Sequence, residues 1–122
     1  MSPALLNLLR KRAWALQKAR AFFAERHFLE VDCPSLTAFA PIDAHIDVME
    51  VSVSENEKGF LHTSPEYAMK RLLASGCGDI FYLGHVFRKG ELGPLHNPEF
   101  TMAEWYRKGF ALSAMWQEAC AF

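Results

Sequence analysis

The stretch that decides the fold is residues 79–107, DIFYLGHVFRKGELGPLHNPEFTMAEWYR. Residues 80–87 and 99–106 are rich in aromatic and other apolar side chains, so each is predicted to form a strand. The residues between them include Gly90, Gly93, Pro94 and Pro98, which predict a loop over 89–98. The segment therefore predicts an antiparallel hairpin.

The second strand of this hairpin has one face of mixed chemistry. Side chains alternate between faces along a strand, so Phe100, Met102, Glu104 and Tyr106 share a face, and Trp105 lies on the other. An unpaired carboxylate is costly in a face that only packs, whereas a face meant only for water would not carry Phe100 and Met102. Such a face suits a ligand with a flat apolar part and a cationic part.

Arg88 ends the first strand and is expected beside this mixed face. An arginine fixed on a strand can hold a carboxylate or phosphate oxygen through its planar fork of donors. The residues alone leave open a simpler alternative, in which Arg88 and Glu104 form a cross-strand ion pair.

The rest of the chain predicts one α+β domain over residues 1–122, with an antiparallel sheet flanked by helices. Ser2-Pro3 and Ser64-Pro65 are typical helix starts, Gly76 is a helix stop, and Ser113 is a candidate cap for a last helix. These signals bound the predicted elements: a helix over 3–26, a short strand over 28–31, a hairpin of 46–53 with 60–62, and a helix from 64 to 76. This order favours an antiparallel sheet over a doubly wound one.

Composition excludes several classes of protein. The 122 residues are 51% apolar and carry a formal net charge of −1, so no global basic field attracts nucleic acid. Three scattered cysteines give neither a disulfide framework nor the spacing of a zinc site. No signal peptide is recognisable, and no apolar run approaches the roughly 20 residues that span a bilayer. A cytoplasmic protein without a membrane partner is expected.

Three ordered segments together resemble the class II lysyl-type aminoacyl-tRNA synthetases. Residues 18–36 resemble motif 1, the helix, strand and proline of the dimer interface. Residues 63–72, TSPEYAMKRL, resemble the amino-acid-binding segment, and residues 87–106 resemble motif 2. The resemblance covers nearly the whole chain and implies part of the catalytic domain of that family, with motifs 1 and 2 present. Within that family, the short sequence motifs SPEY, MKRLL, GCG and HNPEFTM most resemble those of the elongation factor P–(R)-β-lysine ligase branch. Members of that branch attach β-lysine to a lysine of elongation factor P.

The resemblance implies ATP-dependent activation of lysine or β-lysine as an adenylate. It makes Arg88 the catalytic residue, which holds the α-phosphate and the substrate carboxylate, and Phe100 the ring that stacks on adenine. The implied ATP-binding residues are Arg88, Lys89, Gly90, Glu91, His96, Asn97 and Phe100. The implied substrate-binding residues are Ser64, Pro65, Glu66, Glu104 and Tyr106, of which Glu66 takes one amine and Glu104 and Tyr106 the other. Periodicity alone still permits Phe100 as a core residue, and Glu66 as a carboxylate favoured by the helix dipole.

The resemblance also implies partners and a metal. Magnesium ions are expected with the ATP, on ligands outside this chain, so no metal ligand is assigned here. Elongation factor P is the expected acceptor and motif 1 predicts a homodimer; tRNA is a partner only if the chain is a lysyl-tRNA synthetase. The start of the chain only a helix before motif 1, without an anticodon-binding domain, favours the ligase branch.

Two departures from the family pattern affect the expectations. Motif 2 ordinarily reads Arg-x-Glu, but Gly90 stands at the third position and Glu91 follows it. His27 stands where the helix before motif 1 ordinarily ends in glycine, which predicts a left-handed residue there. Motif 3 is expected beyond Phe122. Gly90 and the missing motif 3 leave open a third possibility, a non-catalytic paralogue that binds a nucleotide or an amino acid.

Overall fold

The computed structural model describes residues 2–122 as a mixed α+β fold. Its elements, in chain order, are α1 (Pro3–Ala24), β1 (Leu29–Glu30), β2 (Leu36–Thr37), β3 (Met49–Ser52), β4 (Lys58–Leu61), α2 (Glu66–Ala74), β5 (Ile80–Phe87), β6 (Glu99–Tyr106) and α3 (Leu112–Ala121). The predicted fold class is confirmed.

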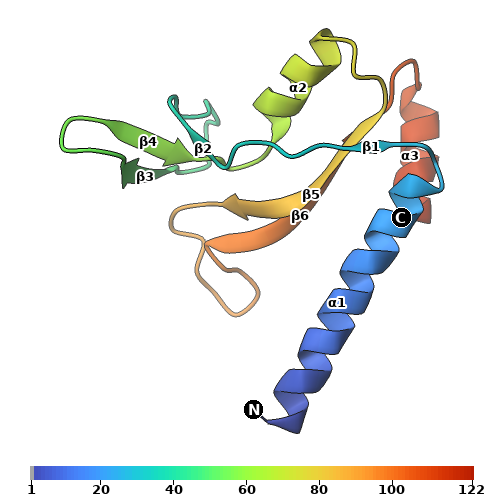
Figure 1. Cartoon of the computed structure of the whole chain (residues 1–122), viewed down its shortest axis with the longest axis horizontal. Coiled ribbons are helices and arrows are strands. Elements are labelled where there is room, and N and C mark those ends of the chain that lie inside the picture. The colour runs from blue at the N-terminus through green and yellow to red at the C-terminus, as the bar shows by residue number, and fades with distance from the viewer. Residues whose placement is uncertain (1) are drawn as a thin grey trace.

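The strands form two small sheets. In the larger, β5 and β6 are antiparallel over their whole length, from the pair Ile80–Tyr106 to the pair Phe87–Glu99. The two-residue strand β1 is added to β5 in parallel. In the other sheet, β4 lies between β2 and β3 and is antiparallel to both. The long hairpin occupies the centre of the molecule, with α2 on one side and the second sheet extending away from its loop end (Figure 1).

Each face of the β5–β6 hairpin packs against a separate core. One core contains Met69 of α2, with Ile80, Tyr82 and Val86 of β5, and Phe100, Met102 and Tyr106 pack against it. The other contains Phe23, Phe28 and Phe81, and Trp105 packs against that one. The predicted alternation along 99–106 is therefore confirmed, with Trp105 on the face opposite Phe100.

Helix α1 projects away from the sheets (Figure 1). The Ser2 hydroxyl accepts a hydrogen bond from the Leu5 backbone N–H at 3.2 Å, as its predicted capping role requires. Phe23 is the one buried residue described in α1, while Leu8 and Trp14 are 63% and 62% exposed. His27, just past the helix, has a φ of 61°, the left-handed conformation expected where the family places glycine.

Several predicted boundaries are wrong in detail, including the end of the first helix at Ala24 and the limits of the first strand, Leu29–Glu30. Ser113 does not cap the last helix, because α3 already begins at Leu112 and Ala111 holds the cap position. Pro65, rather than Ser64, is the N-cap residue of α2, and the Ser64 hydroxyl accepts from the Glu66 N–H at 3.4 Å. The strand predicted over 46–53 is limited to Met49–Ser52, and Asp47 instead forms an isolated bridge in which its carbonyl accepts a hydrogen bond from the Lys89 N–H at 2.9 Å.

Candidate active site

Arg88 is held in place directly after β5. Its backbone N–H donates to the Pro98 carbonyl at 2.8 Å, and its Nε donates to the Thr63 carbonyl at 3.4 Å. The guanidinium carbon lies 5.2 Å from the centre of the Phe100 ring. The hairpin register thus brings an arginine at the end of one strand and an aromatic ring near the start of the next to the same place.

Arg88 and Phe100 open onto a cavity of about 560 Å³, lined also by Gly90, Glu91, Leu92, Leu95, His96 and Asn97. The structure therefore brings together every residue predicted to bind ATP except Lys89. Lys89 is exposed, its backbone N–H donates to the Asp47 carbonyl, and it is not among the residues that line the cavity.

The direction of the loop after Arg88 depends on the backbone conformation of Gly90. The φ of Gly90 is +80°, a conformation that residues with a Cβ atom rarely adopt. The next residue, Glu91, turns back so that its Oε1 lies 3.7 Å from Nη1 of Arg88. The carboxylate one position after the family's usual glutamate therefore reaches the arginine of motif 2. Farther along, Gly93 and His96 close a tight turn through backbone hydrogen bonds of 3.0 and 3.3 Å.

Glu104 and Tyr106 form the second part of the site, farther along β6. The Tyr106 hydroxyl donates to Oε1 of Glu104 at 2.9 Å. Burial raises the pKa of Glu104 and the Tyr106 hydrogen bond lowers it; nearby Glu66 raises it and nearby Lys70 lowers it. Burial also raises the pKa of Tyr106, and the bond to Glu104 raises it further. The phenol therefore stays protonated and remains a donor to the carboxylate.

Glu66 lies at the start of α2, and its carboxylate forms an ion pair with Lys70 one turn later. Lys70 was not predicted as a site residue, although its i,i+4 spacing from Glu66 is a recognisable signal for such a pair. The remaining predicted substrate residues lie just before α2: Pro65 is buried, and Ser64 lines a second cavity of about 800 Å³ together with Lys70 and Tyr67.

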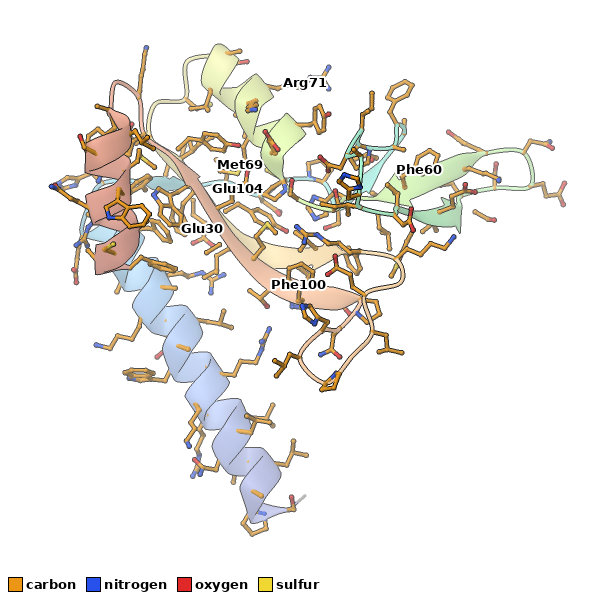
Figure 2. The ribbon with its side chains drawn as sticks, turned by 180° about the vertical axis from the view of Figure 1, so that it is seen from behind. Glu30, Phe60, Met69, Arg71, Phe100 and Glu104 are labelled. Carbon is orange, nitrogen blue, oxygen red and sulfur yellow. The ribbon has the colours of Figure 1, made fainter. Side chains whose placement is uncertain are left out.

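The two parts of the site lie on one face of β6. Phe100 and Glu104 are four residues apart, which is about 13 Å along an extended strand. Figure 2 shows Glu104 on the part of the hairpin toward α2, and Phe100 farther toward the loop end of β6. Arg88 pairs with Glu91, and Glu104 is bonded by Tyr106, so the simple cross-strand ion pair of Arg88 with Glu104 is not formed.

This arrangement can hold an anionic, ring-bearing group at one end and an ammonium group at the other. Over residues 2–122, no three histidine, cysteine or acidic side chains come together as a metal site. Within the same part of the chain, no helix combines the length and the apolar character that a membrane span needs.

The chain is similar in sequence to known proteins over most of its length. The family model of class II tRNA synthetases of the D, K and N types matches residues 1–117. The chain is 48% identical to the elongation factor P–(R)-β-lysine ligase of Pasteurella multocida over 114 residues, which are 89% of this chain and 35% of the relative. The ligases of the same name from Vibrio cholerae and Haemophilus influenzae are 43% and 44% identical, over 97% and 96% of this chain and 38% of each relative.

The chain thus spans between a third and two fifths of the length of these curated relatives. The matched region includes the hairpin, its loop, the start of α2 and the two residues before it, which together carry all the candidate site residues. The chain belongs to the class II tRNA synthetase family of the D, K and N types.

Proposed function

We propose that this chain is part of the catalytic domain of an ATP-dependent ligase that activates lysine or β-lysine and transfers it to a lysine of elongation factor P. The observation that carries the proposal is the single face on which Arg88 and Phe100 line one cavity while Glu104 and Tyr106 lie farther along the same strand. The three relatives named above are ligases of this kind.

In the proposed first step, a carboxylate oxygen of the amino acid attacks the α-phosphorus of ATP, and pyrophosphate leaves with the electrons of the broken P–O bond. Phe100 stacks on the adenine, Asn97 and His96 contact the nucleotide, and Arg88 binds the α-phosphate and the attacking carboxylate. A preorganised cation at developing charge contributes about 10²–10³ in rate. Glu66 and Glu104 fix the two amines of the substrate.

In the second step, the amine of the acceptor lysine attacks the acyl carbon of the adenylate. The new amide bond forms, AMP leaves, and the amine loses a proton. Magnesium would neutralise charge on the ATP phosphates; since the described residues bring no metal cluster together, the proposal assigns no magnesium ligand to this chain. The proposed setting for both steps is the cytoplasm.

A homodimer is part of the same proposal. Leu5, Leu8, Leu9 and Trp14 lie exposed on α1, and Leu29 is exposed directly after it. Leu29 lies in the segment that resembles motif 1, residues 18–36, and the four residues of α1 precede that segment. Their burial against a second copy would remove apolar surface from water. Sedimentation equilibrium of the chain tests this point separately from catalysis.

The proposal is tested best by a hybrid protein, because the chain spans only part of its relatives. Residues 1–117 replace the matching segment of the Pasteurella multocida ligase. We expect the hybrid to exchange pyrophosphate with ATP in the presence of (R)-β-lysine or lysine, and to modify elongation factor P. A hybrid that is folded by circular dichroism but supports no exchange, while the intact relative does, contradicts the proposal.

The second candidate function is a lysyl-tRNA synthetase, which the description of the matching family includes. Both functions share the activation step and differ in the acceptor. Transfer of labelled lysine to tRNA(Lys), set beside transfer to elongation factor P in the same preparation, distinguishes them. A third candidate, a paralogue that binds without catalysis, is favoured by Gly90 at the position of the family's glutamate. Nucleotide binding without exchange would support it.

A further inference from the structure

Two carboxylates at the far end of the site are each held through one oxygen. Tyr106 donates to Oε1 of Glu104, and Lys70 pairs with Oε1 of Glu66. The second oxygen of each carboxylate has no side-chain partner among the contacts of the described residues. Because a carboxylate accepts through both oxygens, each group keeps an acceptor position for a ligand.

Lys70 is placed so that it acts on both carboxylates. It comes one turn after Glu66 on α2, and its charge also lowers the pKa of Glu104 on β6. Glu66 has the opposite effect, since a second negative charge beside Glu104 raises the pKa of Glu104. The ammonium group of Lys70 therefore opposes the repulsion between the two carboxylates.

The other groups near Glu104 offer no equivalent positive charge. On its own strand Glu104 faces the Tyr106 phenol, and its partner across the hairpin is Tyr82, whose hydroxyl donates to the His85 carbonyl. From the segment after β1, the Glu104 charge acts on Cys33, whose pKa is raised mainly by burial and then by Asp32 and Glu104. Of the groups that shift the pKa of Glu104, Lys70 is the one cation.

We propose that Lys70 is a positioning residue of this site: it fixes Glu66 through one carboxylate oxygen, leaves the other oxygen to a substrate ammonium group, and offsets the negative charge that Glu66 places beside Glu104. Lys70 thus holds Glu66 through one carboxylate oxygen, as Tyr106 holds Glu104. The inference rests on the proposed function only in naming the ligand as a lysine-type diamine.

The first test needs no ligand. The side-chain carboxyl of Glu104 is followed by NMR from acidic to basic pH in the chain itself, with Glu104→Gln to assign the signal. We expect Lys70→Met to raise the pKa of Glu104 and Lys70→Arg to leave it near the wild-type value. Lys58→Met is the control, since Lys58 forms a similar but more exposed ion pair with Glu50 in the β3–β4 hairpin and is expected to leave Glu104 unaffected.

The second test measures the affinity of the hybrid ligase described above for L-lysine across the same pH range by calorimetry. Lys70→Met is expected to weaken binding about 10-fold, the loss of one charge-assisted contact, at a pH between the Glu104 pKa of the wild type and the higher Glu104 pKa of the variant. The loss should shrink above the variant's Glu104 pKa, where the carboxylate is ionised in both proteins, and Lys70→Arg should restore the wild-type profile. A merely structural lysine would weaken binding by the same factor at every pH.

An unchanged titration of Glu104 in Lys70→Met overturns the proposal for Lys70. A shifted titration together with no lysine binding by the hybrid ligase, when the intact relative does bind lysine, supports the role of Lys70 and counts against the proposed substrate. The two failures are therefore distinguishable.

Discussion

The guanidinium of Arg88 lies 5.2 Å from the centre of the Phe100 ring, and both side chains line the same cavity. Backbone hydrogen bonding fixes this relationship, because the Arg88 N–H donates to the Pro98 carbonyl just before Phe100's strand begins. A cation and a flat ring are thus presented together, as a nucleotide requires for its phosphates and its base.

Arg88→Ala is expected to abolish pyrophosphate exchange in the hybrid ligase, with a loss of about 10²–10³ or more in rate, because the developing charge loses its preorganised donor. Arg88→Lys keeps the charge but loses the planar fork, so it should recover only part of the rate. Exchange is measured with labelled pyrophosphate. Near-normal exchange in Arg88→Ala would falsify the assignment of Arg88 as the phosphate-binding residue.

Gly90→Ala is expected to lower the free energy of unfolding by about 1 kcal/mol, because a Cβ atom is strained at the φ of +80°. Space is not the reason, since no atom lies within 4 Å of the position that this Cβ would take. Gly93→Ala is the matched control: it lies in the same loop, with the same open space and no left-handed φ. Urea unfolding of both variants checks the difference; equal losses would mean that backbone strain is not involved.

The β5–β6 hairpin and its faces were predictable because their signal is local. Glu104 between Met102 and Tyr106 follows a strict period of two, and Arg88 directly precedes a loop rich in glycine and proline. Given those boundaries, the hairpin register places Arg88 beside Phe100. The resemblance to motif 2, rather than the strand pattern, named Gly90, Glu91, His96 and Asn97 in the cavity lining. It also named Lys89, which does not line the cavity, and it did not name Leu92 and Leu95, which do.

The contacts that depend on a loop course or on distant pairing were not predicted. The Glu91 carboxylate approaches Arg88 because Gly90 adopts a left-handed conformation. A glycine in the sequence permits that conformation but does not predict it. The parallel pairing of β1 with β5 involves two residues and joins distant parts of the chain, so periodicity cannot detect it. Ser113 was a wrong cap because a serine in the first turn of a helix resembles one just before it.

Glu104→Gln is expected to stabilise the fold at neutral pH and to have little effect at acidic pH. The folded pKa of Glu104 is raised, mainly by burial. Its contribution to stability is therefore fully present below the unfolded-state pKa and is lost as the pH rises through the folded pKa. Glutamine removes this loss, and its oxygen still accepts from Tyr106. Urea unfolding of both proteins across this pH range measures the effect; a destabilised variant at neutral pH contradicts it.

Trp105→Ala is expected to affect stability more than catalysis, because Trp105 packs with Phe23, Phe28 and Phe81 on the face away from the site. The lost packing should cost about 2–3 kcal/mol for this partly buried ring. Thermal unfolding is compared with exchange kinetics of the hybrid ligase below its melting temperature. A large loss of rate at an unchanged melting temperature would reverse the assignment of the two faces.

Glu118→Ala tests what holds α3 against the hairpin. Glu118 is 9% exposed and accepts hydrogen bonds from the Trp105 indole at 3.1 Å and from Nε of Arg107 at 2.9 Å. Removing the carboxylate leaves a largely buried guanidinium with only Asp79 as an acidic partner. The expected cost is about 3–5 kcal/mol, typical of breaking a buried ion pair on one side.

The control for this prediction is Glu50→Ala, which breaks an exposed pair with Lys58 and should change stability by about 0–1 kcal/mol. Denaturant unfolding followed by tryptophan fluorescence reports both variants, since Trp105 itself loses a partner in Glu118→Ala. Equal, small effects would show that Glu118 contributes no more than a surface charge. A large effect of Glu118→Ala alone would show that this carboxylate holds α3 against the hairpin. Glu118 is the residue of α3 that bonds to both Trp105 and Arg107.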